Sequence, residues 1–310
     1  MPPLRIVSLI SSATEMLYAL GLGDNVVAVS HECDWPPEIT KKPRATTANI
    51  DASRPSGEID VQVRSKLAAG EPLYGIDGDL IAALRPGLIV TQAQCDVCAV
   101  RLDDVRAMIA TRPELQATQL VSLQPNRLDE IFEDVLRVGE ATGAAAAAED
   151  FIAELKARVA RVRQNVARQL QSQPRRRVAI IEWTEPLMLA GNWTPELVEI
   201  AGGYCPLAIA GEHSRYHNWS EVAAFDPEAI VVAPCGFDLQ RAILEARPLQ
   251  RLPGWQDTSA ARAGRIFALD GNAYLNRSGP RIVDTLEILA ELFWGDNVPD
   301  AACLLTDDAT

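Results

Sequence analysis

The chain has 310 residues, enough for one large domain or two ordinary ones, and 48% of them are hydrophobic while 23% are charged. This composition is that of a globular protein and argues against a disordered, collagen-like or disulfide-dense chain. The net charge of −13 argues against nucleic-acid binding and against docking on anionic lipid, since both need a basic face, but it suits small ligands or basic protein partners.

The first third of the chain alternates short apolar runs with helical patterns. Strands are predicted at 5–10, 25–30, 88–91 and 119–122. Helices are predicted at 11–20, 79–84 and 100–110, and residues 34–73 are expected to be loop with some helix. Strands that are separated by helices predict βαβ units and a parallel sheet.

The middle of the chain is helical. One helix is predicted at 126–139 and a long one at 144–171, which would span roughly 40 Å. The apolar residues of the long helix recur in steps of three and four and form one stripe: Phe151, Ile152, Leu155, Val159, Val162, Val166 and Leu170. A helix of this length is suited to connect two lobes.

The last third repeats the α/β pattern. Strands are predicted at 177–181, 229–233 and 265–268, and helices at 194–201, 220–224, 239–246 and 279–293. The fold class is therefore α/β, with two parallel-sheet lobes joined by a long backbone helix. The expected organisation is an N-terminal lobe over 1–125, a linker with the long helix over 126–173, a C-terminal lobe over 174–296 and a loose acidic tail over 297–310.

Two segments echo each other, one in each lobe. Residues 79–90 (DLIAALRPGLIV) and 221–232 (EVAAFDPEAIVV) each contain an acidic residue, a short helical stretch, a proline turn and an apolar strand. The echo favours two lobes related by a pseudo-repeat, although convergence on a common helix–turn–strand unit would give the same pattern.

No apolar run reaches the roughly 18 residues needed to cross a bilayer, so we expect no membrane insertion. Residues 1–10 lead into a predicted strand without the regions of a secretory signal. We expect a cytoplasmic protein as the sequence is written, or a periplasmic one if an export signal has been removed. We expect a monomer rather than an oligomer.

Taken in order, several segments resemble the class III solute-binding proteins of ABC importers, and most closely their cobalamin (vitamin B12)-binding branch. The resemblance covers about residues 4–295. It rests on the long central helix and on RIVSLISSATE at 5–15, VAVSHECDWPP at 27–37, LIAALRPGLIV at 80–90, LVEIAGG at 197–203 and GPRI at 279–282. The order of these pieces is more specific for the fold than for the ligand.

The resemblance implies non-catalytic binding of a corrinoid, cobalamin or a precursor, in a cleft between two lobes, for transport or delivery through an ABC importer permease. By position, the aromatic residues that best match ligand-facing ones are Tyr74, Trp183, Tyr216 and Tyr274. Further candidates, which also lie in predicted loops or at their ends, are Trp193, His213, His217, Trp219 and Asn276. The family also docks its transporter through one carboxylate on each lobe, which here match Asp79, where Glu is usual, and Glu221.

Histidine can ligate the cobalt of a corrinoid or the iron of haem, and His213 and His217 are the candidates for this role. Solvent-exposed or hydrogen-bonded loop histidines are the simpler interpretation of both residues.

The segment QCDVC, with Cys95 and Cys98, departs from the family pattern. It follows a predicted strand and is expected to open the next helix, where thiolates are stabilised. The pair is interpreted as a redox motif, as part of a zinc site completed by His31 and Cys33, as a thiolate ligand of cobalt, or as ordinary thiols.

The sequence contains no nucleophile-elbow, phosphate-loop or dinucleotide-binding motif, so no enzyme activity is expected. Binding of a corrinoid is the leading hypothesis. The alternatives are binding of haem, an iron-siderophore or another metal chelate, and a cytosolic corrinoid- or thiol-handling protein that uses Cys95 and Cys98. A nitrogenase-like cluster scaffold is disfavoured by the lack of further cysteines in suitable contexts.

Overall fold

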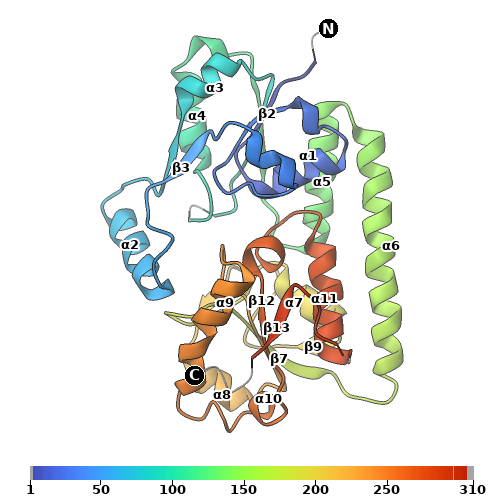
Figure 1. The fold of residues 1–310 in the computed structure, drawn as a ribbon. Coiled ribbons are helices and arrows are strands. Elements are labelled where there is room, and N and C mark those ends of the chain that lie inside the picture. Colours follow the sequence, from blue (N-terminus) through green and yellow to red (C-terminus); the bar gives the residue numbers. More distant parts are fainter. Residues whose placement is uncertain (1–2, 96, 296, 306–310) are drawn as a thin grey trace. The chain divides into compact units, whose positions relative to one another are not determined.

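The computed structural model describes residues 3–95, 97–295 and 297–305 (Figure 1). Its contacts divide the chain into two compact units. Unit 1 comprises residues 1–54, 58–125 and 129–154, and unit 2 comprises residues 55–57, 126–128 and 155–310. The division falls inside the long helix α6 (Ala145–Gln169).

Unit 1 is built on a four-stranded parallel sheet. The strands are β1 (Ile6–Ser8), β2 (Val26–Val29), β5 (Leu88–Gln92) and β6 (Gln119–Leu123), in the order β2-β1-β5-β6. Every residue of β5 is buried, as expected for a strand covered on both faces. The helices are α1 (Ser11–Ala19), α3 (Gly78–Leu84), α4 (Leu102–Ala110) and most of α2 (Ser56–Ala68) and α5 (Leu128–Thr142).

Two expectations for unit 1 need correction. The region 34–73 contains the expected helix, α2, but also a strand that was not predicted, β3 (Thr46–Ala48), which pairs antiparallel with β4 (Tyr74–Ile76). The segment around Cys95 and Cys98 does not open a helix. The helix α4 begins only at Leu102, so the two cysteines lie in the connection between β5 and α4, with Cys98 in a turn.

Unit 2 contains a mixed sheet in the order β10-β8-β7-β11-β12-β13. Its centre is parallel, as predicted, and consists of β7 (Arg176–Trp183), β11 (Ala229–Val232) and β12 (Ile266–Leu269). At its flanks, β8 (Met188–Leu189) pairs antiparallel with β7, β10 (Arg215–Tyr216) pairs antiparallel with β8, and β13 (Ala302–Leu304) pairs antiparallel with β12. The strand β9 (Gly203–Tyr204) pairs parallel with the start of β7.

The segment expected to be a loose tail therefore contributes a strand, because β13 pairs with β12. Residues 296 and 306–310 of that segment lie outside the described part of the chain. The helices of unit 2 are α7 (Thr194–Ile200), α8 (Trp219–Phe225), α9 (Leu239–Ala246), α10 (Ser259–Arg262), α11 (Ile282–Trp294) and the second part of α6.

The helix α6 matches the predicted long helix closely. The stripe residues Leu155, Val159, Val162 and Val166 are all at least 93% buried, as the helical period predicts. Within unit 2, Arg158 on α6 forms ion pairs with Asp284 and with Glu287 on α11. None of the helices described, α6 included, is long and apolar enough to cross a membrane.

The echo between the two segments extends to backbone geometry. The helices α3 and α8 have seven residues each, and each ends at a non-glycine residue in the left-handed region, Arg85 at φ 45° and Asp226 at φ 51°. Each of these residues is followed by a proline and, two residues later, by a buried strand. Left-handed geometry is unusual for residues with a Cβ, so its recurrence at equivalent positions supports a pseudo-repeat.

Candidate functional site

The carboxyl ends of the parallel strands of unit 2 carry three of the nine candidate ligand residues, Trp183, Tyr274 and Asn276. Trp183 is the last residue of β7, Phe237 follows β11, and Tyr274 follows β12 in a short helical turn, η5 (Gly271–Leu275). In α/β sheets, ligands commonly bind outside the carboxyl ends of the strands. This edge is therefore the candidate site of unit 2.

Register aligns three large side chains across this edge. Trp183 on β7 pairs with Met188 on β8, and Met188 pairs in turn with Tyr216 on β10. Directly opposed residues of a regular ladder point to the same face of a sheet. The β7–β8 pairing has a bulge or irregularity between Ile181 and Trp183, and the register resumes at the Trp183–Met188 pair. Tyr216 is 56% exposed and the other two are half-buried. This Trp–Met–Tyr row can offer an apolar surface to a flat ligand.

Trp183, at one end of the row, packs against Phe237. The ring of Phe237 lies 5.3 Å from that of Trp183, centroid to centroid, and Phe237 itself is buried. The guanidinium of Arg241 on α9 lies 3.7 Å from the Phe237 ring centroid, which is a cation–π contact. These contacts restrict the position of Trp183 and reduce the entropy that ligand binding would have to remove.

A buried carboxyl group lies next to the row. Glu182 accepts a hydrogen bond from the Ser214 hydroxyl at 2.6 Å, and the same hydroxyl accepts one from the Gly191 amide at 2.9 Å. Burial raises the pKa of Glu182, and the hydrogen bond from Ser214 only partly offsets this. Glu182 thus links the end of β7 to the segment before β10.

Three of the candidate ligand residues have structural contacts instead. The indole of Trp193 is 4% exposed and donates to the Leu275 carbonyl at 3.0 Å. Trp219 stacks on Trp255, with centroids 4.9 Å apart, and packs against the unit's core. Asn276 donates its side-chain amide to the Ala233 and Gly271 carbonyls, at 2.9 and 3.3 Å, and so braces the turn after β12.

The two candidate histidines differ. His217 is 13% exposed, its Nδ1 lies 3.2 Å from a Glu221 carboxylate oxygen, and its Nε2 is buried. His213 is exposed in the segment before β10. Of the two, His213 is therefore the one whose ring can reach a ligand without a rearrangement. Tyr274, the remaining candidate of unit 2, is half-buried, and its ring centroid lies 5.6 Å from the Arg281 guanidinium.

In unit 1, Tyr74 connects two loops that follow strands of the sheet. Its ring lies 5.4 Å from the His31 ring, and its hydroxyl donates to the Val97 carbonyl at 2.8 Å. His31 is held by Thr46, whose hydroxyl lies 2.7 Å from His31 Nδ1. Burial, and to a smaller extent the nearby Arg44, lower the pKa of His31, so its ring is neutral at pH 7.

The predicted zinc set of His31, Cys33, Cys95 and Cys98 is not assembled. Within the described residues, no three side chains of the metal-binding types are placed to hold an ion. The reason is the strand order, since β1 lies between β2 and β5 and separates the loops that follow them. Cys33 is buried, and its sulfur lies 3.1 Å from the Thr14 hydroxyl. Cys95 and Cys98 do lie together, with their sulfurs 2.7 Å apart.

The two candidate docking carboxylates are also unlike each other. Asp79, in the first turn of α3, is 93% exposed and pairs with Arg112 at 2.9 Å. Glu221 is 51% exposed and forms a capping box with Asn218 at the start of α8. A capping carboxylate satisfies a main-chain N–H of the helix terminus. Glu221 therefore has a structural role that Asp79 does not share.

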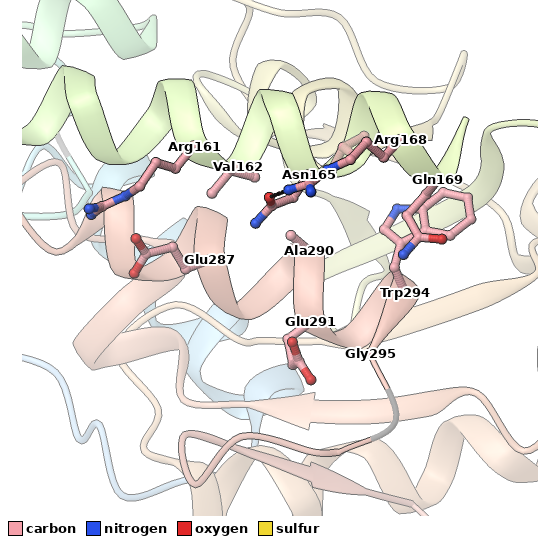
Figure 2. A pocket seen from close by; sticks show the side chains of 11 residues that line it. Arg161, Val162, Asn165, Arg168, Gln169, Glu287, Ala290, Glu291, Trp294 and Gly295 are labelled. Atoms are coloured by element: carbon pink, nitrogen blue, oxygen red, sulfur yellow. Dashed lines mark hydrogen bonds between the residues drawn. The ribbon is translucent and has the colours of Figure 1, made fainter. Parts of the chain in front are cut away.

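A groove of about 650 Å³ lies between α6 and α11 in unit 2 (Figure 2). Its walls carry charges of both signs, and the residues that line it include Arg161, Asn165, Arg168, Glu287, Glu291 and Trp294. None of the candidate ligand residues lines this groove. It is a gap between two packed helices rather than part of the strand-end site.

Three residues of the strand-end site, Phe237, Arg241 and Met188, were not among the predicted candidates. Phe237 follows a predicted strand, and the rule that singled out Trp183 would have found it. Arg241 contributes only through its contact with Phe237, and Met188 only through the pairing of β8, so neither has a signal in the sequence.

Comparison with known proteins agrees with this architecture. The chain is 23% identical over 296 residues to an uncharacterised ABC transporter substrate-binding lipoprotein of Bacillus subtilis, covering 95% of this chain and 81% of that protein. It is 24% identical to a vitamin B12-binding protein of Vibrio cholerae, covering 92% and 87%. Its fold is similar to that of a periplasmic heme-binding protein from Pseudomonas aeruginosa, with a TM-score of 0.73, 21% identity and coverage of 96% and 95%.

The sequence model of the periplasmic binding protein family matches residues 6–273, which is most of the chain. The two α/β units and the long helix α6 that connects them in sequence are the features expected of its helical-backbone class. The chain therefore belongs to the periplasmic binding protein family, in the class whose two lobes are joined by a long helix.

Proposed function

We propose that this chain binds a corrinoid, cobalamin or a precursor, without catalysing a reaction, and delivers it to an ABC importer. The observation that carries the proposal is the Trp–Met–Tyr row of Trp183, Met188 and Tyr216 at the carboxyl edge of the unit 2 sheet. A corrinoid is large, flat and rimmed with amides, so it needs an apolar surface with polar groups at its margin. The name of the Vibrio cholerae relative supports the same ligand class.

The polar margin is supplied by residues around the row. His213 and Arg215 are exposed in the same segment as Tyr216. Tyr274 lies in the turn after β12, half-buried. Within unit 1, Tyr74, held by its hydrogen bond to the Val97 carbonyl, is proposed separately as a ligand residue.

Haem is the second candidate ligand. The phenol of Tyr216 is 56% exposed, and the neighbouring His213 is exposed as well. Phenolate and imidazole both ligate haem iron, so this pair of residues favours haem more than it favours a siderophore.

Spectral titration of the full chain distinguishes these candidates. Aquocobalamin, dicyanocobinamide and hemin are titrated separately, and their visible bands are followed. We expect saturable binding of one corrinoid per chain and weaker binding of hemin. Binding of hemin alone would assign the haem function instead, and binding of none of the three would refute both.

Matched variants test the row itself. Trp183→Ala and Tyr216→Ala each remove an aromatic face, and we expect about a tenfold loss of corrinoid affinity, equivalent to about 1.4 kcal/mol. The control is Tyr204→Ala, because Tyr204 is 44% exposed but lies beside the start of β7, at the other end from Trp183. An equal loss in the control would show that the row is not the binding surface.

Importer docking through Asp79 and Glu221 is part of the same proposal. The two variants Asp79→Asn and Glu221→Gln keep the size of each side chain and remove its charge. We expect each to reduce uptake of labelled cobalamin in the native host while leaving cobalamin affinity in solution unchanged. Unchanged uptake in both variants would exclude a docking role.

A further inference from the structure

The turn that follows β5 brings two sulfur atoms together. The Gln92 side chain, at the end of β5, accepts a hydrogen bond from the Cys95 amide at 2.9 Å and donates one to the Cys95 carbonyl at 2.7 Å. The Val97 amide points at Cys95 Sγ, 3.4 Å away, and the Cys98 thiol donates to the same sulfur at 2.7 Å. These contacts hold the two thiols together.

The pair is accessible from outside, in contrast to the other cysteine of the same region. Cys98 is exposed and Cys95 is half-buried, whereas Cys33 is only 2% exposed. Thiol–disulfide exchange requires that a small disulfide can reach the attacking sulfur. Cys98 meets this requirement, and Cys95 lies in position to attack next.

A metal does not account for the pair as well as a disulfide does. Stable zinc sites use four protein ligands, or three with a water. Within residues 3–95, 97–295 and 297–305, no third side chain is placed to complete such a site. Two adjacent thiols are sufficient for a disulfide.

The turn also contacts a residue outside it. The Val97 carbonyl, between the two cysteines, accepts the hydrogen bond from the Tyr74 hydroxyl. Tyr74 packs in turn against the His31 ring. A change in the order of the turn therefore acts directly on the anchor of Tyr74.

We propose that Cys95 and Cys98 form a reversible disulfide by exchange with low-molecular-weight disulfides, and that its closure fixes the turn whose Val97 carbonyl anchors Tyr74. In the first step the Cys98 thiolate attacks one sulfur of the small disulfide and displaces one small thiolate. In the second step the Cys95 thiolate attacks Cys98 Sγ and displaces the other. The protein loses two electrons and two protons, and the small disulfide becomes two thiols.

The test is a redox titration of the full chain in glutathione buffers of varied ratio. Samples are acid-quenched, alkylated and measured by intact mass, so no ligand is needed and failure would leave the corrinoid proposal untouched. We expect one transition in which two alkylation sites disappear together. Cys98→Ser should abolish it, and Cys303→Ser, which alters a half-buried cysteine on β13, should preserve it. Two sites that remain alkylatable at every ratio would overturn the disulfide.

The anchor is tested with Tyr74→Phe, which keeps the ring and removes the hydroxyl donor. This hydrogen bond is already formed in the dithiol state, and the proposal requires it to be stronger when the disulfide fixes the turn. Its loss should therefore make the disulfide easier to reduce, by up to about 12-fold, measured as the shift of the glutathione midpoint. Tyr18→Phe on α1, the matched control in unit 1, should not shift the midpoint. An unchanged midpoint in Tyr74→Phe would overturn the coupling between the turn and Tyr74.

Discussion

The buried carboxyl group of Asp134 allows a quantitative prediction of how the free energy of unfolding depends on pH. Asp134 on α5 has a side chain that is only 2% exposed, and Arg137 donates to its Oδ1. Burial raises the pKa of Asp134 to about 7, and this effect outweighs Arg137 and the Gln124 amide, both of which lower it. Glu130 and Glu133 raise it further by repulsion.

The sign and size of the effect follow from the two pKa values. In the unfolded chain the Asp134 carboxyl titrates near 3.8, its ordinary value, and in the folded chain near 7. The folded state therefore holds the proton more tightly, so the contribution of this group to stability is fully present below pH 3.8 and is lost as the pH rises through 7. Between pH 5 and pH 8 this group alone lowers the free energy of unfolding by about 2–3 kcal/mol.

The substitution Asp134→Asn removes the titration while keeping the shape of the side chain. Urea unfolding at pH 5 and pH 8 measures how much free energy of unfolding the wild type and the variant each lose between the two pH values. Carboxyl ¹³C NMR of the wild type measures the pKa of Asp134 directly. We expect the free energy of unfolding to fall by about 2–3 kcal/mol less in the variant than in the wild type between these pH values. Asp150→Asn, the same change at an exposed position of α6, is the control and should leave the loss intact. A carbon signal that titrates near pH 4, or an equal pH loss in Asp134→Asn and wild type, would refute the reasoning.

Three further predictions concern packing and backbone geometry, and each is measured by thermal or urea unfolding. A Cβ at Gly202 (φ +86°) would meet an indole nitrogen at 2.7 Å, so Gly202→Ala should cost about 2–4 kcal/mol. Gly264→Ala (φ +62°, open space) should cost only about 1 kcal/mol, and equal costs would contradict the packing argument. Asp226→Gly should lower the free energy of unfolding more than Arg85→Gly does. The Asp226 carboxylate accepts hydrogen bonds from the Ser259 amide and hydroxyl and from the Arg177 guanidinium, whereas Arg85 is exposed. The reverse order would exclude this explanation. Trp219→Phe should lower Tm, because it removes the hydrogen bond from the indole to the Pro253 carbonyl and reduces the stacking on Trp255, and it should leave corrinoid affinity unchanged. Weaker binding at unchanged Tm would place this residue in the ligand site.

The local pattern of apolar residues was sufficient to predict the helices and strands whose buried face follows a regular period in the sequence. The apolar stripe of α6 predicted its bounds within two residues at either end, and the run at 88–91 predicted the buried strand β5. The strands β8, β10 and β13 could not be found in this way. They have two or three residues each, too few to show alternation, and they are defined by their pairing with β7 and β12.

The candidate site shows the same limit. Sequence placed Trp183 after a strand and Tyr216 before a short helix, but it could not reveal that Met188 lies between them in register. It also could not separate Trp219, which stacks in the core, from an aromatic that faces solvent. The zinc hypothesis failed for a topological reason, because the order β2-β1-β5 inserts a strand between the two loops.

The final strand has a consequence for self-association. Without β13, the strand β12 would form the border of the sheet, and β12 is wholly apolar in sequence, Ile266–Leu269. An apolar border with unpaired main-chain groups is a template on which other chains can add strands. The short segment Ala302–Leu304 covers that border and so protects the protein against aggregation. A chain truncated before residue 302 should therefore remain foldable at low concentration and form β-rich oligomers as its concentration rises.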